Sequence, residues 1–112
     1  MTDRGRIVVV AAGFGLWKGG RCLAAGKWTD IARVRAYPAG AGEPGSTCVA
    51  IQLRDESEVE VRSEAPGWSS FVNTAQAKLP GMIPVDDWLP AMTASTDARH
   101  EIVLFQRPSS SF

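Results

Sequence analysis

The strongest constraint on the fold is an alternation of apolar and polar residues on both sides of an acidic turn. Every second residue is apolar in residues 47–54, and the same spacing returns in residues 57–63, after Asp55 and Glu56. Successive side chains of a strand point to opposite faces, so each segment can bury one face and expose the other. The pattern therefore predicts an antiparallel hairpin. Its predicted inward side chains are Val49, Ile51, Leu53, Val59 and Val61.

Further strands are predicted towards the N-terminus. Residues 6–12 are rich in valine and predict a strand that is buried on both faces. Residues 18–21 contain two adjacent glycines and predict the turn of a hairpin. These glycines and those at positions 13 and 15 are predicted to be turn residues that accept a positive φ. Residues 28–37 alternate again, and the predicted outer face of that strand holds Arg33, Arg35 and Tyr37.

The apolar period changes after Pro66. In residues 67–79 apolar residues recur three and four positions apart, which predicts one buried face of a helix, and a Pro-Gly pair follows. Residues 84–89 predict a short turn that tucks in Trp88, and residues 102–107 predict a last strand that is apolar on both faces. The predicted fold class is α+β, with a twisted antiparallel sheet of about six or seven strands and one main helix near residues 67–79.

Length and composition indicate one domain. The chain has 112 residues, of which 45% are hydrophobic, enough for a single core. We expect residues 1–107 to form that domain and the Ser-rich residues 108–112 to form a flexible tail. No apolar run is long enough for a secretory signal or a membrane span. Cys22 and Cys48 are predicted to be reduced thiols, with a disulfide between them as the alternative, so we expect a cytoplasmic protein.

The charges cancel overall but are distributed unevenly. There are 12 basic and 12 acidic residues, whereas nucleic-acid binders usually have a basic excess, so we expect no nucleic acid as partner. Residues 1–35 hold seven basic and two acidic residues, and residues 36–112 hold five basic and ten acidic residues. The molecule is therefore predicted to have a basic and an acidic side.

No catalytic or metal-binding pattern is found. The single histidine, His100, lies in a polar stretch and is predicted to be an exposed loop residue. Cys22, Cys48 and His100 are too few and too dispersed for a metal site. Asp86 and Asp87 are more typical of charges that complement a helix N-terminus than of ligands. The N-terminal glycines lack the spacing and the helix of a dinucleotide site. We therefore expect no enzymatic activity, no metal and no cofactor.

An acidic run marks the predicted binding site. It consists of Asp55, Glu56, Glu58, Glu60 and Glu64. Such a run suits a basic protein partner, because opposite charges accelerate encounter and strengthen a desolvated contact. Two alternatives stay open. The run can serve solubility and protect a strand edge, or the partner can bind the face of Arg33, Arg35 and Tyr37 instead.

A series of residues over 28–107 resembles a family of small uncharacterised bacterial proteins, some of which resemble immunity proteins that neutralise a co-inherited toxin. The series consists of Trp28, Ile31, Val34, Ala36, Tyr37, Ile51, Gln52, Leu53, Val59, Val61, Pro66, Gly67, Trp68, Phe71, Leu79, Pro80, Gly81, Trp88, Leu104 and Arg107. The chain departs from that family in residues 38–42, which lack acidic residues, and in residues 97–100, which lack an aromatic residue.

The resemblance implies a PH-like or similar antiparallel sheet with a helix. It also implies a non-catalytic protein that blocks a cognate toxin domain, one with a basic cleft if the toxin is a nuclease. We do not expect a membrane partner on this interpretation. The alternative function is a PH-like adaptor or a module that binds anionic surfaces through Lys18, Arg21 and Lys27.

Overall fold

A computed structural model describes residues 5–39, 45–94 and 100–107. These residues form an α+β fold with seven strands and two α-helices, which confirms the predicted class. Every strand pair is antiparallel, also as predicted. The elements, in chain order, are β1 (Arg6–Val10), β2 (Gly13–Lys18), β3 (Arg21–Lys27), the 3-10 turn η1 (Trp28–Asp30), β4 (Ile31–Pro38), β5 (Thr47–Leu53), β6 (Glu58–Arg62), α1 (Trp68–Lys78), α2 (Val85–Ala94) and β7 (Ile102–Gln106).

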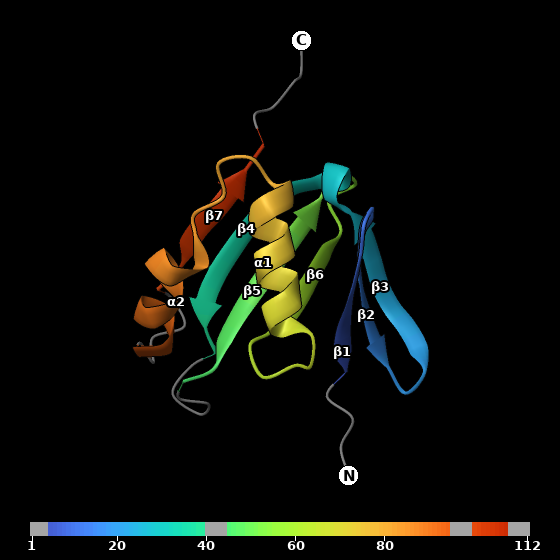
Figure 1. Cartoon of the computed structure of the whole chain (residues 1–112), viewed down its shortest axis with the longest axis horizontal. Helices are drawn as coiled ribbons and strands as arrows, with labels where there is room; N and C mark the ends of the chain where they lie inside the picture. The colour runs from blue at the N-terminus through green and yellow to red at the C-terminus, as the bar shows by residue number, and fades with distance from the viewer. Residues whose placement is uncertain (1–4, 40–44, 95–99, 108–112) are drawn as a thin grey trace.

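The strands divide into two sheets and do not form the single sheet that was predicted. The first sheet has the order β1-β2-β3 and the second has the order β6-β5-β4-β7. The division falls at η1, between β3 and β4 (Figure 1). The Trp28 amide donates to the Ala12 carbonyl at 3.1 Å, and its indole N–H donates to the Val10 carbonyl at 3.3 Å. Burial of Trp28 at this junction therefore ends β3 and directs the chain into the second sheet.

The β5–β6 hairpin has the register that the alternation predicts. Val49 lies opposite Val61, and Ile51 lies opposite Val59. All four side chains are buried, which confirms their predicted direction. The outward residues of β6 are consequently fixed on the other face of the sheet, because neighbours along a strand point to opposite sides.

The core lies between α1, α2 and the two sheets. In Figure 1, α1 lies in front of the four-stranded sheet, with the three-stranded sheet on one side and α2 on the other. Phe71 of α1 joins these layers, since its ring centroid is 5.5 Å from that of Phe14 and 6.0 Å from that of Trp28. The two helices meet through Trp68 and Trp88, 6.3 Å apart. The helix face predicted from the sequence is buried as expected, at Trp68, Phe71, Val72 and Ala75.

The two strands with continuous apolar runs each expose part of one face. In β1, Ile7 is buried but Val10 is 56% exposed, so the prediction of burial on both faces is wrong. In β7, Leu104 is buried and Val103 is exposed. In the described chain, α1 is the layer that covers β1. The Ile7 amide also donates a hydrogen bond, at 2.8 Å, to the carbonyl of Pro66, which precedes α1. The opposite side of β1 therefore faces solvent.

The N-terminal glycines have two different roles. Gly19 and Gly20 form the predicted hairpin turn, with φ of 59° and 76°. Gly13 and Gly15 lie within β2, so their prediction as turn residues is wrong. A Cβ on Gly13 would lie 2.1 Å from the Gly26 carbonyl oxygen. Gly13 is therefore explained by the close approach of two backbones rather than by a turn.

The predicted short turn after Pro84 is a ten-residue helix, α2. Its interior contains Pro90, a residue that removes a helical hydrogen bond and disfavours a helix by about 3 kcal/mol. Trp88 and Met92 are four residues apart on α2 and are both buried in the core. Their burial offsets the effect of the proline, because each large apolar side chain contributes roughly 1.5–3 kcal/mol when it leaves water.

The cysteines and termini complete the comparison with the sequence. Cys22 is exposed in β3 and Cys48 is buried in β5, and both are free thiols, so the alternative of a disulfide between them is wrong. Burial raises the pKa of the Cys48 thiol. In the described part of the chain, neither helix has the length and apolar character to cross a membrane. The predicted tail, residues 108–112, lies outside the described residues.

Candidate functional site

The outer face of the four-stranded sheet carries two of the five predicted site residues, Glu58 and Glu60 of β6. It is the face that points away from α1 and α2. Arg35 of β4 lies opposite Ala50 of β5, which in turn lies opposite Glu60 of β6. The Arg35 guanidinium donates to a carboxylate oxygen of Glu58 and to one of Glu101, each at 2.8 Å. Arg35 thus joins β6 at one edge of the sheet to the residue that precedes β7 at the other.

Tyr37 holds a second carboxylate on the same face. Its hydroxyl donates a hydrogen bond to Glu60. Burial raises the pKa of Tyr37 well above its ordinary value, and the hydrogen bond to Glu60 raises it further. Tyr37 therefore stays protonated, and remains a donor to Glu60, far into the alkaline range. We call the five residues Arg35, Tyr37, Glu58, Glu60 and Glu101 the outer array.

The outer array covers two small side chains of β5. Cys48 and Ala50 point to the same side as Arg35 and Tyr37, yet they are 2% and 1% exposed. The long polar side chains of the neighbouring strands exclude water from them. The outer array is consequently a packed layer with fixed positions, and not a set of independent solvated charges.

The remaining predicted carboxylates lie at the two ends of β6. Glu64, beyond its last residue, accepts a hydrogen bond from the Ser46 hydroxyl at 2.5 Å and lies 3.7 Å from the Arg62 guanidinium. Asp55, in the turn before β6, accepts hydrogen bonds from the amide and the hydroxyl of Ser57. The Ser57 hydroxyl, followed by its amide, lowers the pKa of Asp55, so this carboxylate stays ionised. Glu56 is exposed at a φ of 71° in the same turn.

The structure thus unites the two surfaces that the sequence left as alternatives. Glu58 and Glu60 on β6 lie on the same face as Arg35 and Tyr37 on β4, and they are bonded to them. Arg33 points to this face as well. Glu101 was not among the predicted residues. The sequence places Glu101 one residue before the last predicted strand. It does not show that this strand lies next to β4, which is what brings Glu101 to Arg35.

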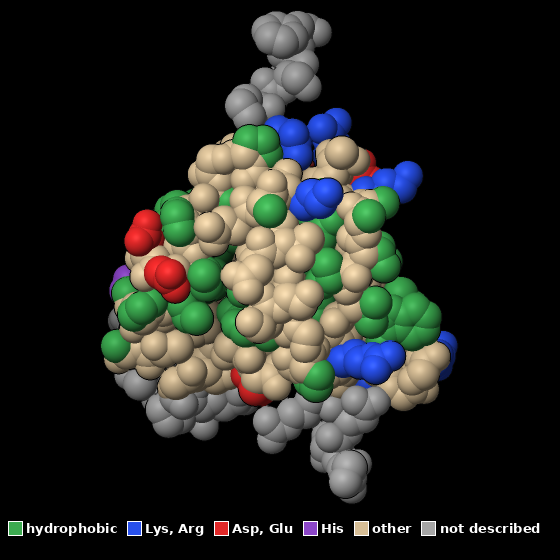
Figure 2. Space-filling model, viewed as in Figure 1, with side chains coloured by type: hydrophobic (Ala, Val, Ile, Leu, Met, Phe, Trp, Pro, Cys, Tyr) green, Lys and Arg blue, Asp and Glu red, His purple; other side chains and the backbone are tan. Residues whose placement is uncertain are grey.

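The three-stranded sheet and the β2–β3 turn carry a contrasting basic surface, which we call the basic sheet face. Arg6 and Lys27 lie on the outward side of the strands, and Lys18 and Arg21 lie beside the turn. Residues 5–27 contain four cationic side chains and no acidic one. Exposed apolar side chains lie among them, at Val10, Trp17 and Leu23. Figure 2 shows hydrophobic and Lys/Arg side chains side by side at this edge of the molecule. The four cations are Arg6, Lys18, Arg21 and Lys27, and no salt bridge connects them to any carboxylate in the described ranges.

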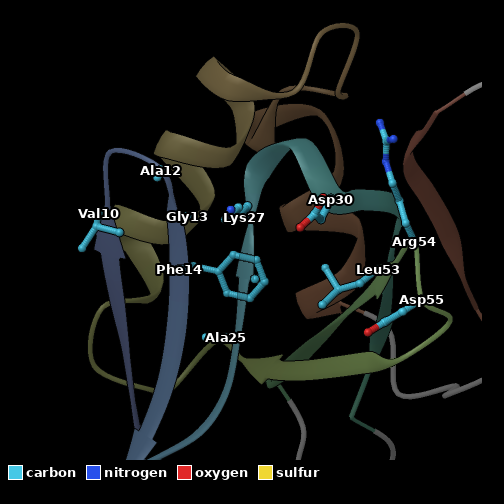
Figure 3. A pocket seen from close by; sticks show the side chains of 11 residues that line it. Val10, Ala12, Gly13, Phe14, Ala25, Lys27, Asp30, Leu53, Arg54 and Asp55 are labelled. Atoms are coloured by element: carbon cyan, nitrogen blue, oxygen red, sulfur yellow. The ribbon is translucent and has the colours of Figure 1, made fainter.

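A pocket of about 630 Å³ lies where the two sheets meet the β5–β6 turn. Its base is apolar, with Phe14 and Leu53 facing one another across it (Figure 3). Charged residues stand around its mouth. The lining residues are Val10, Ala12, Gly13, Phe14, Ala25, Gly26, Lys27, Asp30, Leu53, Arg54 and Asp55. Of the predicted acidic site, only Asp55 borders this pocket, and no sequence pattern predicted the cavity itself.

The other chemical candidates lie apart from these surfaces. His100 is exposed just before β7, as predicted. Asp86 and Asp87 lie in the first turn of α2, which confirms their predicted place at a helix N-terminus. Across residues 5–39, 45–94 and 100–107, no three His, Cys, Asp or Glu side chains are grouped as metal ligands would be.

Comparisons with known proteins add no relationship. No family model matches the sequence, no curated protein matches it, and no solved structure matches the fold. The resemblance to immunity proteins therefore stays a prediction.

Proposed function

We propose that this chain is a non-catalytic, cytoplasmic binding protein that neutralises a toxin domain by covering its basic cleft with the outer array. The observation that supports this proposal most directly is that Glu58 and Glu60 are held in place by Arg35 and Tyr37. A carboxylate that is already ordered loses less side-chain freedom when a partner binds.

The outer array keeps hydrogen-bond acceptors that such a partner can use. The carboxylate of Glu58 bonds to Arg35 through Oε2, and its side chain is still 47% exposed. Its second oxygen can accept a hydrogen bond from an arginine or lysine of the partner without disrupting the array. The turn of Asp55 and Glu56 extends the negative charge beyond the edge of the sheet. Such a surface favours both fast association with a basic cleft and rejection of acidic partners.

The test is co-purification of the full chain with the product of the adjacent reading frame, followed by affinity measurement. Glu58→Gln combined with Glu60→Gln is expected to weaken binding by about tenfold, mainly through slower association, and to reduce its salt dependence. Glutamine is chosen because it keeps the acceptor oxygen, whereas a cation at either position would repel Arg35.

The matched control is Asp86→Asn with Asp87→Asn, which makes the same change of charge on α2, on the opposite side of the sheet. It should leave affinity unchanged. An affinity that is equally insensitive to both double variants would show that Glu58 and Glu60 do not contribute to binding the partner.

A second function is supported by the basic sheet face, and it corresponds to the PH-like interpretation of the fold. Cations that form no salt bridge within the described residues surround exposed Trp17 and Leu23 and suit an anionic membrane surface, where each Lys or Arg contributes about 1 kcal/mol. On this alternative, the chain binds vesicles that contain phosphatidylserine, and Lys18→Gln or Arg21→Gln each weakens binding about fivefold. Equal binding to vesicles of phosphatidylcholine alone, or no binding at low salt, would eliminate it.

A further inference from the structure

We infer that the pocket between the two sheets receives a basic side chain of the protein partner. The aliphatic stem of an arginine or lysine packs against Phe14 and Leu53, and its cationic end lies between Asp30 and Asp55. This inference rests on the proposed function and identifies the anchor residue of the partner. An anchor residue is a single inserted side chain that supplies much of the affinity.

The apolar base of the pocket depends on a missing side chain. A Cβ on Gly26 would lie 3.0 Å from Cδ2 of Leu53 and 3.2 Å from Cε1 of Phe14. Any residue other than glycine at this position in β3 would therefore crowd the space between these two side chains. Gly26 lets Phe14 and Leu53, which are 4% and 9% exposed, close on the backbone of β3. The apolar edge that they present to the pocket suits the methylene groups of a long basic side chain.

The charges around the mouth favour a cation. Asp30 and Asp55 reach the pocket from opposite sides and direct their carboxylates towards it, whereas Arg54 points away (Figure 3). No salt bridge neutralises Asp30 or Asp55 within the described residues. Lys27 is the one cation left at the mouth, opposite Gly13 in the β2–β3 register, on the outward side of β3. The flexible side chain of Lys27 lets its ammonium group turn to solvent. The carboxylates of Asp30 and Asp55 then attract the basic side chain of the partner.

The size and position of the pocket agree with a side chain presented by a protein. A volume of about 630 Å³ lies within the range of roughly 300–1,000 Å³ for ligand pockets and admits the guest side chain together with part of its backbone. Asp55 belongs both to this pocket and to the acidic turn that leads into β6. A partner that meets Glu58 on the outer array can therefore reach the pocket around the same turn.

The experiment uses short peptides as probes and needs no partner. A blocked tripeptide with arginine between two leucines is titrated into the full chain, and backbone amide shifts are followed by NMR. The same peptide with glutamine or glutamate at its centre is titrated in parallel. The arginine peptide is expected to shift the amides of Gly26, Asp30, Leu53 and Asp55 and to bind about three- to tenfold more tightly than the glutamine peptide.

Two double variants locate the effect. Asp30→Asn with Asp55→Asn is expected to abolish the preference for arginine; asparagine at position 55 keeps an acceptor for Ser57, so the turn stays intact. Asp86→Asn with Asp87→Asn should preserve the preference. Equal affinity for the three peptides, tighter binding of the glutamate peptide, or shifts that avoid the pocket would each overturn the inference. Because the probes contain no toxin, a failed co-purification leaves this result standing, and a negative result here leaves the test of Glu58 and Glu60 unaffected.

Discussion

Phe71→Ala is expected to lower the free energy of unfolding by about 3–5 kcal/mol, as measured by equilibrium denaturation. Phe71 is 1% exposed, and its ring meets Phe14 edge-on at 5.5 Å and stacks on Trp28 at 6.0 Å. These three rings join α1, the three-stranded sheet and η1. Truncation removes the transfer energy of a large side chain and leaves a cavity that rigid backbones on three sides cannot close.

The control is Trp17→Ala, which removes a larger aromatic side chain from an exposed position. Trp17 is 38% exposed on the basic sheet face and lies across Gly15, with its indole nitrogen 3.1 Å from where a Cβ of that glycine would stand. We expect a loss of about 1 kcal/mol or less, since substitutions outside the core have small effects. A greater loss for Trp17→Ala than for Phe71→Ala would mean that the two sheets are not held together by the aromatic cluster.

The parts of the fold that were predicted correctly are those in which the local pattern and the tertiary contact agree. In the β5–β6 hairpin, the partner of each strand is the next segment of the chain, so alternation alone sets the pairing of Val49 with Val61. The face of α1 was visible for the same reason, because its period is intrinsic to the helix. Neither inference requires knowledge of a distant segment.

The errors arise where a distant contact overrides the local pattern. Trp28 was assigned to the strand that follows it, but its burial beside Phe14 and Phe71 makes a 3-10 turn and separates two sheets. A proline at position 90 disfavours a helix when only the local sequence is considered. The burial of Trp88 and Met92 explains why α2 nevertheless continues past Pro90. Tertiary packing decides both cases.

The candidate site follows the same rule. The acidic residues of β6 were predicted to point outward, and they do. Their partners were not predictable, because Arg35 lies 23 residues from Glu58 and 66 residues from Glu101 in the chain. The pocket is harder still to predict from the sequence. It depends on the absence of a side chain at Gly26 and on how the two sheets are placed relative to each other.

Gly67→Ala is expected to destabilise the fold by about 3 kcal/mol or more, through two effects that act together. Gly67 is the N-cap of α1 and has a φ of 90°, a conformation that disfavours a side chain by roughly 1–2 kcal/mol. A Cβ there would also lie 2.0 Å from the carbonyl oxygen of Ile7. The chain can relieve this overlap only by moving β1 away from the start of α1, which breaks the hydrogen bond from the Ile7 amide to the Pro66 carbonyl.

Gly81→Ala separates these two effects. Gly81 has a similar φ of 80°, but apart from its chain neighbours no described residue has an atom within 4 Å of its Cβ position. Only the backbone strain should remain, and we expect a loss of about 1–2 kcal/mol. The difference between the two variants, measured by denaturation in the same buffer, reports the contact between β1 and α1. The contrary result is that Gly67→Ala lowers the free energy of unfolding no more than Gly81→Ala does. In that case β1 moves away from α1 without loss of stability, and the close approach of the three-stranded sheet to α1 does not stabilise the fold.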